Sequence, residues 1–259
     1  MSRLARNLES REERVQKPMT DQICTILFDL DGTLLDNDMD VFLPYYFDKL
    51  AGRMSGLVPP DTFMEGLMQG TEAMLANAGQ ETNEEVFSRV FYPLVGLPRE
   101  VLEPVFMEFY SVDFPDLQEH TRSKPEAPDV VGKAFALGCD VVVATNPLFP
   151  ATAVEQRLRW AGVADYPYSL VTSFENSRAT KPNLLYFEQI LAVVGCPPGA
   201  ALVVGDEDMD MVAAHLGCRT FLIPGSRTKL GPSTPEPDYH GSLADVGELL
   251  ENWSGTEGD

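Results

Sequence analysis

The chain has 259 residues, of which 44% are hydrophobic and 23% are charged, a composition typical of a soluble globular protein with one sizeable core and a smaller module. Its formal net charge of −21 argues against nucleic-acid binding, which needs a basic surface. No apolar stretch approaches the length of a transmembrane helix, and residues 1–20 lack the apolar segment of a signal peptide. We therefore expect a cytoplasmic protein with a flexible N-terminal extension and no membrane partner. Cys24 and Cys139, in or beside predicted strands, are expected to be buried free thiols.

The first informative segment is an apolar run, residues 23–28, followed at once by Asp29, Asp31 and Gly32. The run is apolar and rich in strand-forming residues, which indicates a strand buried on both faces. Residues i and i+2 of an extended segment point the same way, so both carboxylates should lie on one side of the strand end. Open α/β sheets bind ligands at such strand ends. A surface turn could have the same sequence, but the apolar strand before it favours a functional site.

Residues 37–125 show no strand alternation. Their hydrophobic residues repeat at helical spacing in four segments, near residues 41–50, 63–68, 86–91 and 101–109, which predicts four amphipathic helices. We interpret them as a helical cap domain inserted into a core domain formed by residues 21–36 and 126–259. Six of the ten methionines lie in this insertion. Methionine usually fills gaps in a core, and we favour that role over a methionine-lined substrate wall.

Beyond the insertion, predicted strands alternate with predicted helices, which favours a parallel sheet with right-handed crossovers. A proline- and glycine-rich stretch is expected to be a surface loop, and a last helix should follow it. The predicted strands are residues 140–145, 168–172, 201–204 and 219–223, the helices are 128–138, 150–161, 183–195 and 209–217, and the loop and last helix are 224–241 and 242–253.

Polar residues of different kinds follow three of these strands. Thr145 and Asn146 come at the end of one strand, and Lys181 lies in the loop after the next. Asp206 and Asp210 follow the strand after that. If the strands are parallel, these groups converge on the edge of the sheet that carries the first two aspartates.

The ordered set of DxDGT, a strand ending in Thr, a Lys-Pro pair and a strand followed by GDxxxD resembles the haloacid dehalogenase-like (HAD) superfamily of aspartate-nucleophile hydrolases. The resemblance covers roughly residues 22–250, and residues 144–150, 159–162 and 175–177 resemble one bacterial subgroup. It implies a Rossmann-like parallel sheet of order 3-2-1-4-5, counted along the core strands, and a helical cap of the C1 type.

The resemblance also implies a role for each polar residue. Asp29 would be the nucleophile that forms an aspartyl-phosphate, and Asp31 the general acid and base. Dehalogenases and phosphonatases of this superfamily lack the second aspartate, so Asp31 favours phosphoryl transfer. Lys181 would neutralise charge on both Asp29 and the phosphoryl group. The groups expected to bind phosphate are the backbone at Gly32, together with Thr145, Asn146 and Lys181.

By the same resemblance, Mg²⁺ would be held by Asp29, Asp206 and the backbone carbonyl of Asp31, while Asp210 would orient a metal-bound water. The net charge of −21 repels an anionic substrate, and a divalent cation here would reverse that field locally.

The sequence thus predicts a Mg²⁺-dependent phosphatase that acts on a small phosphorylated metabolite through an aspartyl-phosphate. Two alternatives stay open. A sugar phosphomutase of the same superfamily shares the whole motif set, and a non-catalytic phosphate-binding protein could retain the fold.

Overall fold

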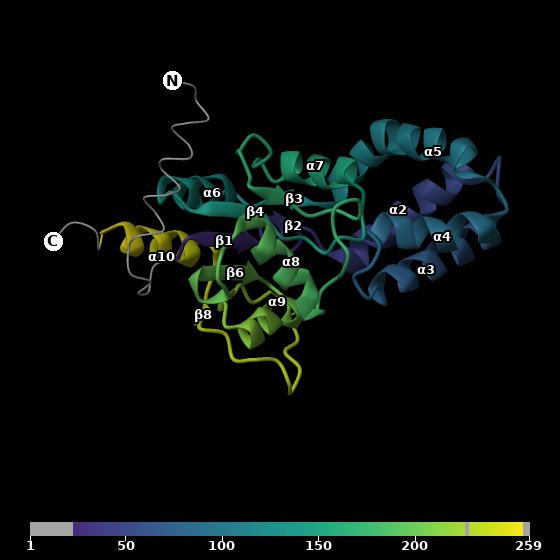
Figure 1. The fold of residues 1–259 in the computed structure, drawn as a ribbon. Helices are drawn as coiled ribbons and strands as arrows, with labels where there is room; N and C mark the ends of the chain where they lie inside the picture. The colour runs from purple at the N-terminus through teal and green to yellow at the C-terminus, as the bar shows by residue number, and fades with distance from the viewer. Residues whose placement is uncertain (1–22, 226–227, 256–259) are drawn as a thin grey trace, which may run out of the picture.

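A computed structural model describes residues 23–225 and 228–255 of the chain. The predicted N-terminal extension, residues 1–20, lies outside the described residues. Figure 1 shows an α/β part built around a sheet and, at one side of it, the helices α2 to α5 of the insertion. Among the described helices, none combines the length and the apolar character needed to cross a bilayer.

Within the described residues, six parallel strands form the central sheet. Their spatial order is β5 (Leu170–Val171), β4 (Asp140–Val143), β1 (Thr25–Phe28), β6 (Ala201–Gly205), β7 (Arg219–Leu222) and β8 (Tyr239–His240). The first five are the expected strands, and they lie in the expected order. Strand β8 corrects our expectation of a loop over residues 224–241. It has only two residues, paired with Phe221 and Leu222 at the sheet edge, and so short a run carries no detectable alternation.

The central strand β1 shows why the sheet is buried on both faces. All four of its residues are buried. Ile26 and Phe28 pack with the helices α6 (Ala127–Ala136), α7 (Ala151–Trp160) and α10 (Leu243–Gly255). Leu27 faces the opposite way, toward α8 (Leu184–Val194) and the 3₁₀ turn η4 (Val212–Leu216). Alternate residues thus contact two separate helical layers, one on each side of the sheet (Figure 1).

Three further details of the α/β part differ from what the sequence predicted. The helix expected at residues 209–217 is a short helix α9 (Asp208–Met211) continued by η4, and it ends at Gly217 in the left-handed conformation. A 3₁₀ turn, η3 (Pro198–Ala200), leads into β6. All four cysteines are free, and Cys139 is buried as expected, but Cys24 is exposed because it comes just before the first residue of the central strand β1.

The insertion consists of four α-helices over residues 37–125, all of which the structure describes, followed by a π-helical and a 3₁₀ turn. The elements are α2 (Met39–Met54), α3 (Pro60–Leu75), α4 (Asn83–Val95), α5 (Arg99–Glu108), η1 (Phe109–Asp113) and η2 (Phe114–His120). Asp38 caps α2, and a capping box between Thr82 and Glu85 begins α4. The chain enters and leaves the insertion through a two-stranded antiparallel ribbon, β2 (Leu35–Asp36) and β3 (Arg122–Ser123), which the sequence did not predict.

Two sets of contacts fix the insertion to the α/β part. In the first, the Phe114 ring stacks on Trp160 of α7 with centroids 5.3 Å apart, and Tyr46 meets Phe149 edge-on at 5.3 Å. The second lies at the start of α4, where the buried Asn83 side chain donates to the carbonyls of Pro147 (3.1 Å) and Ala179 (3.3 Å). These contacts hold the insertion against the strand ends from both sides.

Replacing Phe114 by Ala tests the first set. Phe114 is fully buried among the rings of α2, η1 and α7, so the substitution should lower the free energy of unfolding by about 3–5 kcal/mol. Urea denaturation followed by circular dichroism measures this loss. The matched control is Val112→Ala, which truncates an exposed side chain of η1 and should cost less than about 0.5 kcal/mol. Similar losses for the two variants would contradict the assigned packing.

Candidate active site

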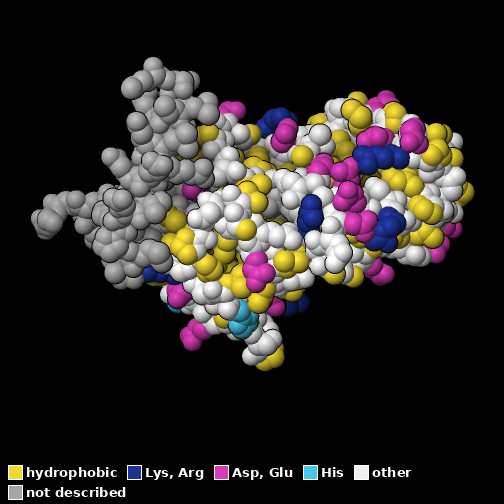
Figure 2. All heavy atoms as spheres, in the orientation of Figure 1, with side chains coloured by type: hydrophobic (Ala, Val, Ile, Leu, Met, Phe, Trp, Pro, Cys, Tyr) yellow, Lys and Arg dark blue, Asp and Glu magenta, His cyan; other side chains and the backbone are white. Residues whose placement is uncertain are grey.

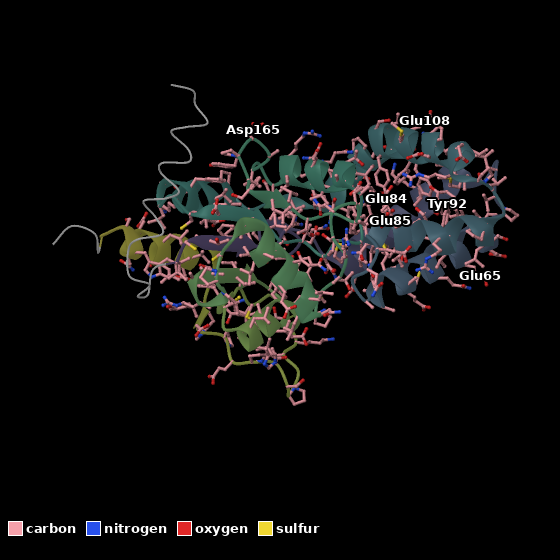
Figure 3. All side chains as sticks on the ribbon, in the orientation of Figure 1. Glu65, Glu84, Glu85, Tyr92, Glu108 and Asp165 are labelled. Atoms are coloured by element: carbon pink, nitrogen blue, oxygen red, sulfur yellow. The ribbon has the colours of Figure 1, made fainter. Side chains whose placement is uncertain are left out.

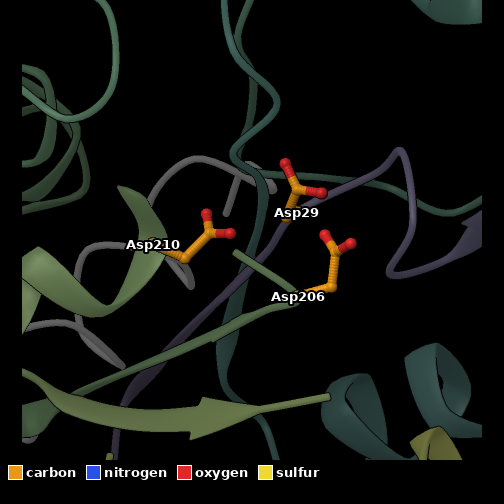
Figure 4. A group of neighbouring side chains, drawn as sticks. All are labelled: Asp29, Asp206 and Asp210. Atoms are coloured by element: carbon orange, nitrogen blue, oxygen red, sulfur yellow. The ribbon is translucent and has the colours of Figure 1, made fainter. Parts of the chain in front are cut away.

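Three carboxylates that lie far apart in the sequence meet at the ends of the central strands. Asp29 follows β1, Asp206 follows β6 and Asp210 belongs to α9 (Figure 4). Among the described residues, one carboxylate oxygen from each of the three lies within 4.8 Å of the others. All three side chains are buried. The structure thus brings together the aspartates that the sequence pattern placed at one sheet edge.

Lys181 bridges two of the three clustered aspartates. Its ammonium donates to Oδ1 of Asp29 at 2.7 Å and to Oδ1 of Asp210 at 2.5 Å, and only 2% of its side chain is exposed. Burial alone would lower the pKa of Lys181, but the neighbouring carboxylates of Asp210 and Asp29 outweigh burial and hold that pKa well above its usual range. Lys181 is therefore a charged, buried group rather than a solvated loop lysine.

The cluster carries three carboxylates and one ammonium. Burial raises the pKa of Asp29, and the negative charges of Asp210 and Asp206 add to this effect. Burial, followed by the charges of Asp210 and Glu207, raises the pKa of Asp206 to about 7. Carboxylate oxygens close together in this way fit Mg²⁺, a hard cation that prefers oxygen ligands and would remove their mutual repulsion.

Gly32 brings the backbone against this cluster. Its φ of +89° favours glycine, and a Cβ atom at this position would collide with the Asp206 carboxylate. Thr33 donates its hydroxyl to Oδ1 of Asp206 at 3.4 Å, and the Lys124 ammonium donates to the carbonyl of Gly32. The turn after β1 and the end of β6 thus form one compact site.

The Asp31 carboxylate lies apart from the three clustered aspartates. The Asn37 amide donates to its Oδ1 at 2.7 Å, and the Arg157 guanidinium donates to its Oδ2. Arg157 belongs to α7, is 1% exposed, and lies over the Phe149 ring at 4.5 Å from the centroid. Both Asp31 oxygens are therefore held by donors from outside the DxDGT turn.

Thr145 and Asn146 follow β4, the strand beside β1. The buried Thr145 accepts hydrogen bonds on its backbone carbonyl from the Thr172 hydroxyl (2.7 Å) and the Tyr186 hydroxyl (2.9 Å). Asn146 accepts from the backbone N–H of Lys181 at 3.2 Å. Asn146 thus fixes the loop that delivers Lys181.

Sequence reasoning missed Arg157, Asn37 and Lys124. Arg157 left a usable signal, because it occupies a position on the apolar face of α7 with Ala153 and Leu158, where an arginine requires a buried partner. Asn37 is six residues after Asp31 but lies outside the DxDGT motif, and Lys124 is 92 residues away from Gly32, so no local pattern connects Lys124 to the site.

Curated relatives include two bacterial phosphoglycolate phosphatases. The chain is 25% identical over 241 residues to the protein from Neisseria gonorrhoeae, with 89% of this chain and 94% of the relative covered. It is 28% identical over 214 residues to the protein from Aquifex aeolicus, with 82% and 89% covered.

The chain is also similar to solved structures. CbbY from Rhodobacter sphaeroides in complex with phosphate has a TM-score of 0.56 and 20% identity, covering 87% of this chain and 97% of that one. L-2-haloacid dehalogenase from Xanthobacter autotrophicus has a TM-score of 0.54 and 15% identity, covering 89% and 99%. At these identities the likeness establishes the fold, and the reaction has to be inferred from the site.

A family model provides the remaining comparison. The model for haloacid dehalogenase-like hydrolases matches residues 23–216, which include β1, the helical insertion and the three clustered aspartates. The family predicted from the ordered motifs is confirmed, and the chain belongs to the haloacid dehalogenase-like hydrolases.

Proposed function

We propose that the protein is a Mg²⁺-dependent phosphatase that hydrolyses a small phosphomonoester through an aspartyl-phosphate at Asp29. The observation that carries this proposal is the buried bridge from the Lys181 ammonium to Asp29 and Asp210, with Asp206 beside it. Such a site pairs a nucleophilic carboxylate with the charge needed to receive a phosphoryl group. The relatives that are phosphoglycolate phosphatases support the same reaction.

In the proposed reaction, an Asp29 oxygen attacks phosphorus while the bond from phosphorus to the leaving oxygen breaks. Asp31, in its protonated form, gives that oxygen a proton and later removes one from the water that hydrolyses the aspartyl-phosphate. Lys181 orients Asp29 and balances phosphoryl charge. The Gly32 backbone, Thr145 and Asn146 would hold the phosphate oxygens.

Bound Mg²⁺ would supply positive charge to the phosphate, with Asp29, Asp206 and the Asp31 carbonyl as its ligands and Asp210 beside it. In the same proposal, residues 37–125 act as the cap domain over a core domain of residues 21–36 and 126–259, in a cytoplasmic protein. Arg157 and Asn37 act as positioning residues that set the direction of the Asp31 carboxylate.

Asp31 is the feature that favours phosphatase over dehalogenase chemistry. A carboxylic acid is useful where an alkoxide must leave, and it has no such role when halide departs. Two donors from outside the turn orient this side chain, one from α7 and one near the start of the insertion. Release of free inorganic phosphate separates a phosphatase from a phosphomutase, which keeps phosphate on the organic product.

Metal binding should stabilise the folded protein. Mg²⁺ binds the assembled aspartates and not the unfolded chain, so at a hundred times the dissociation constant it should add about 2.7 kcal/mol to the free energy of unfolding. The melting temperature measures this, with Na⁺ at matched ionic strength as the control for screening. The gain should disappear in Asp206→Asn. An equal rise in wild type and variant, or with Na⁺, would show that the metal site is wrongly assigned.

Asp29→Asn should abolish phosphate release from any phosphomonoester. The amide nearly matches the carboxylate in shape but is a very poor nucleophile, so a loss of roughly 10³-fold or more is expected. Phosphate release from p-nitrophenyl phosphate with Mg²⁺ is the measurement, and circular dichroism verifies the fold. Activity within about tenfold of wild type would refute the nucleophile assignment.

Asp31→Asn should lower activity by about 10²–10⁴-fold on an alkyl phosphate and by much less on p-nitrophenyl phosphate, whose leaving group needs little protonation. The variant also removes the charge that pairs with the buried Arg157, and a resulting loss of folded protein would lower both rates together, so absolute rates alone do not test the role of Asp31. The ratio of the two rates is independent of the folded fraction. An unchanged ratio would count against Asp31 as the general acid.

A further inference from the structure

A cavity of about 1050 Å³ lies between the helical insertion and α7. Helices α2, α3, α4 and α5 and the residues after β4 contribute to its wall. Most of the lining side chains are apolar, and they include Leu43, Phe47, Leu67, Phe106 and Phe174. The contacts of Phe114 and Asn83 that fix the insertion to the α/β part hold the opposing walls in place. The cavity is therefore a built feature of the fold.

The buried side chains of Asn37 and Arg157 lie between the proposed general acid and the wall of the cavity. The Asn37 amide that donates to Asp31 also contacts the sulfur of Met39 at 3.5 Å, and Met39 lines the cavity. The Arg157 guanidinium, which holds the other Asp31 oxygen, lies over the ring of Phe149, another lining residue. In the proposed reaction Asp31 meets the leaving oxygen, so the alcohol part of the substrate is on this side of the site.

The charged residues of the lining disfavour an anionic occupant. Among the described residues, four glutamates and two arginines line the cavity: Glu84, Glu103, Glu155, Glu175, Arg99 and Arg159. Both arginines are already paired. Arg99 contacts Glu84 at 2.6 Å and Glu103 at 2.9 Å, and Arg159 contacts Glu155 at 3.4 Å. Figure 3 labels Glu84 at the start of α4 and Tyr92, a further lining residue, later in this helix.

Methionine side chains, which are flexible, form part of the cavity lining. Four of the six methionines of the insertion line the cavity, namely Met39, Met68, Met74 and Met107. The core role we expected holds for the buried Met54 and Met74, and Met74 also lines the cavity. Met68 and Met107 are 47% and 68% exposed and belong to the mouth. Figure 2 shows hydrophobic side chains reaching the surface of this part among charged ones. Flexible thioether side chains suit an apolar ligand of variable shape.

We propose that this cavity binds the alcohol part of the substrate, and that this part is a large, uncharged, mainly hydrocarbon group. The inference rests on the proposed phosphatase function and specifies its substrate class. A cavity of this size matches a drug-sized ligand, and a two-carbon acid such as glycolate would leave most of it empty. The excess of glutamates also repels a substrate carboxylate. The specificity therefore differs from that of the relatives named phosphoglycolate phosphatase.

A series of alkyl phosphates from ethyl to octyl, kept below micelle formation, tests the proposal with Mg²⁺ present. The value of kcat/KM should rise about fourfold per added methylene until the cavity is filled, because each buried methylene contributes a constant increment. Phosphoglycolate should be hydrolysed less efficiently than octyl phosphate. Phosphate release that is independent of chain length, or highest with phosphoglycolate, would overturn the substrate class while leaving the phosphatase function intact.

Binding of alkylphosphonates, which cannot be hydrolysed, separates the two proposals. Calorimetry with Mg²⁺ should give tighter binding of octylphosphonate than of ethylphosphonate, with a negative heat-capacity change from apolar burial. That result without phosphate release from any ester would support the cavity site and refute the phosphatase function. Equal affinities for the two phosphonates would overturn the cavity site whatever the catalytic result.

A matched pair of variants locates the binding site of the alkyl chain. Met107→Glu places a charge at the cavity mouth, and Val112→Glu places the same charge on an exposed η1 residue outside the lining. Met107→Glu should lower kcat/KM for octyl phosphate about tenfold and change that for ethyl phosphate little, since the hydrated carboxylate removes apolar surface against which only the longer chain is buried. Val112→Glu should change neither. Equal effects of the two variants on octyl phosphate would contradict the proposed site.

Discussion

Three carboxylates and one ammonium share a buried volume at the ends of β1 and β6, and their charge balance constrains the structure around them. Lys181 can compensate for only part of the negative charge of Asp29, Asp206 and Asp210. Burial and mutual repulsion then raise the pKa values of Asp29 and Asp206. A site of this kind favours a bound cation, because a cation relieves the repulsion among the carboxylates that folding has brought together.

The sheet supplies the rigidity that such a cluster needs. Strand β1 is hydrogen-bonded to β4 on one side and β6 on the other, with helices packed on both faces. Asp29 and Asp206 are therefore carried by adjacent strands whose register is fixed. Gly32 allows the backbone to pass against Asp206 where any side chain would collide. The close approach of like charges is thus set by backbone geometry, not by attraction among the charges themselves.

Residues outside the sheet also contribute to the site, at the start of the insertion and on the helix packed against it. Asn37, just before α2, and Arg157, on the helix against which the insertion packs, hold the two oxygens of Asp31. Both side chains then contact residues of the large apolar cavity. This arrangement connects the orientation of the proposed general acid with whatever occupies the cavity. The proposed reaction centre and the cavity are therefore connected through Asn37 and Arg157, and they are built from different parts of the chain.

Much of the fold followed from local patterns. The apolar run before Asp29, the strand–helix alternation after residue 126 and the four amphipathic segments of the insertion each depend on periodicities that neighbouring residues define. The ordered motifs also identified the cluster of Asp29, Lys181, Asp206 and Asp210, because parallel strands place their ends at one edge. Strand β8 and the β2–β3 ribbon escaped detection because each strand has only two residues and depends on a distant partner.

From the sequence came the polar residues that follow each strand, and the alternation of strands with helices indicated that the strands are parallel and bring those residues to one sheet edge. Only the packed structure shows that Arg157 holds Asp31, and that four methionines of the insertion line a cavity, Met74 while also belonging to the core. Those outcomes depend on how α7 and the insertion pack against each other. Packing of this kind brings together residues more than a hundred positions apart, and no periodicity within either segment encodes such a contact.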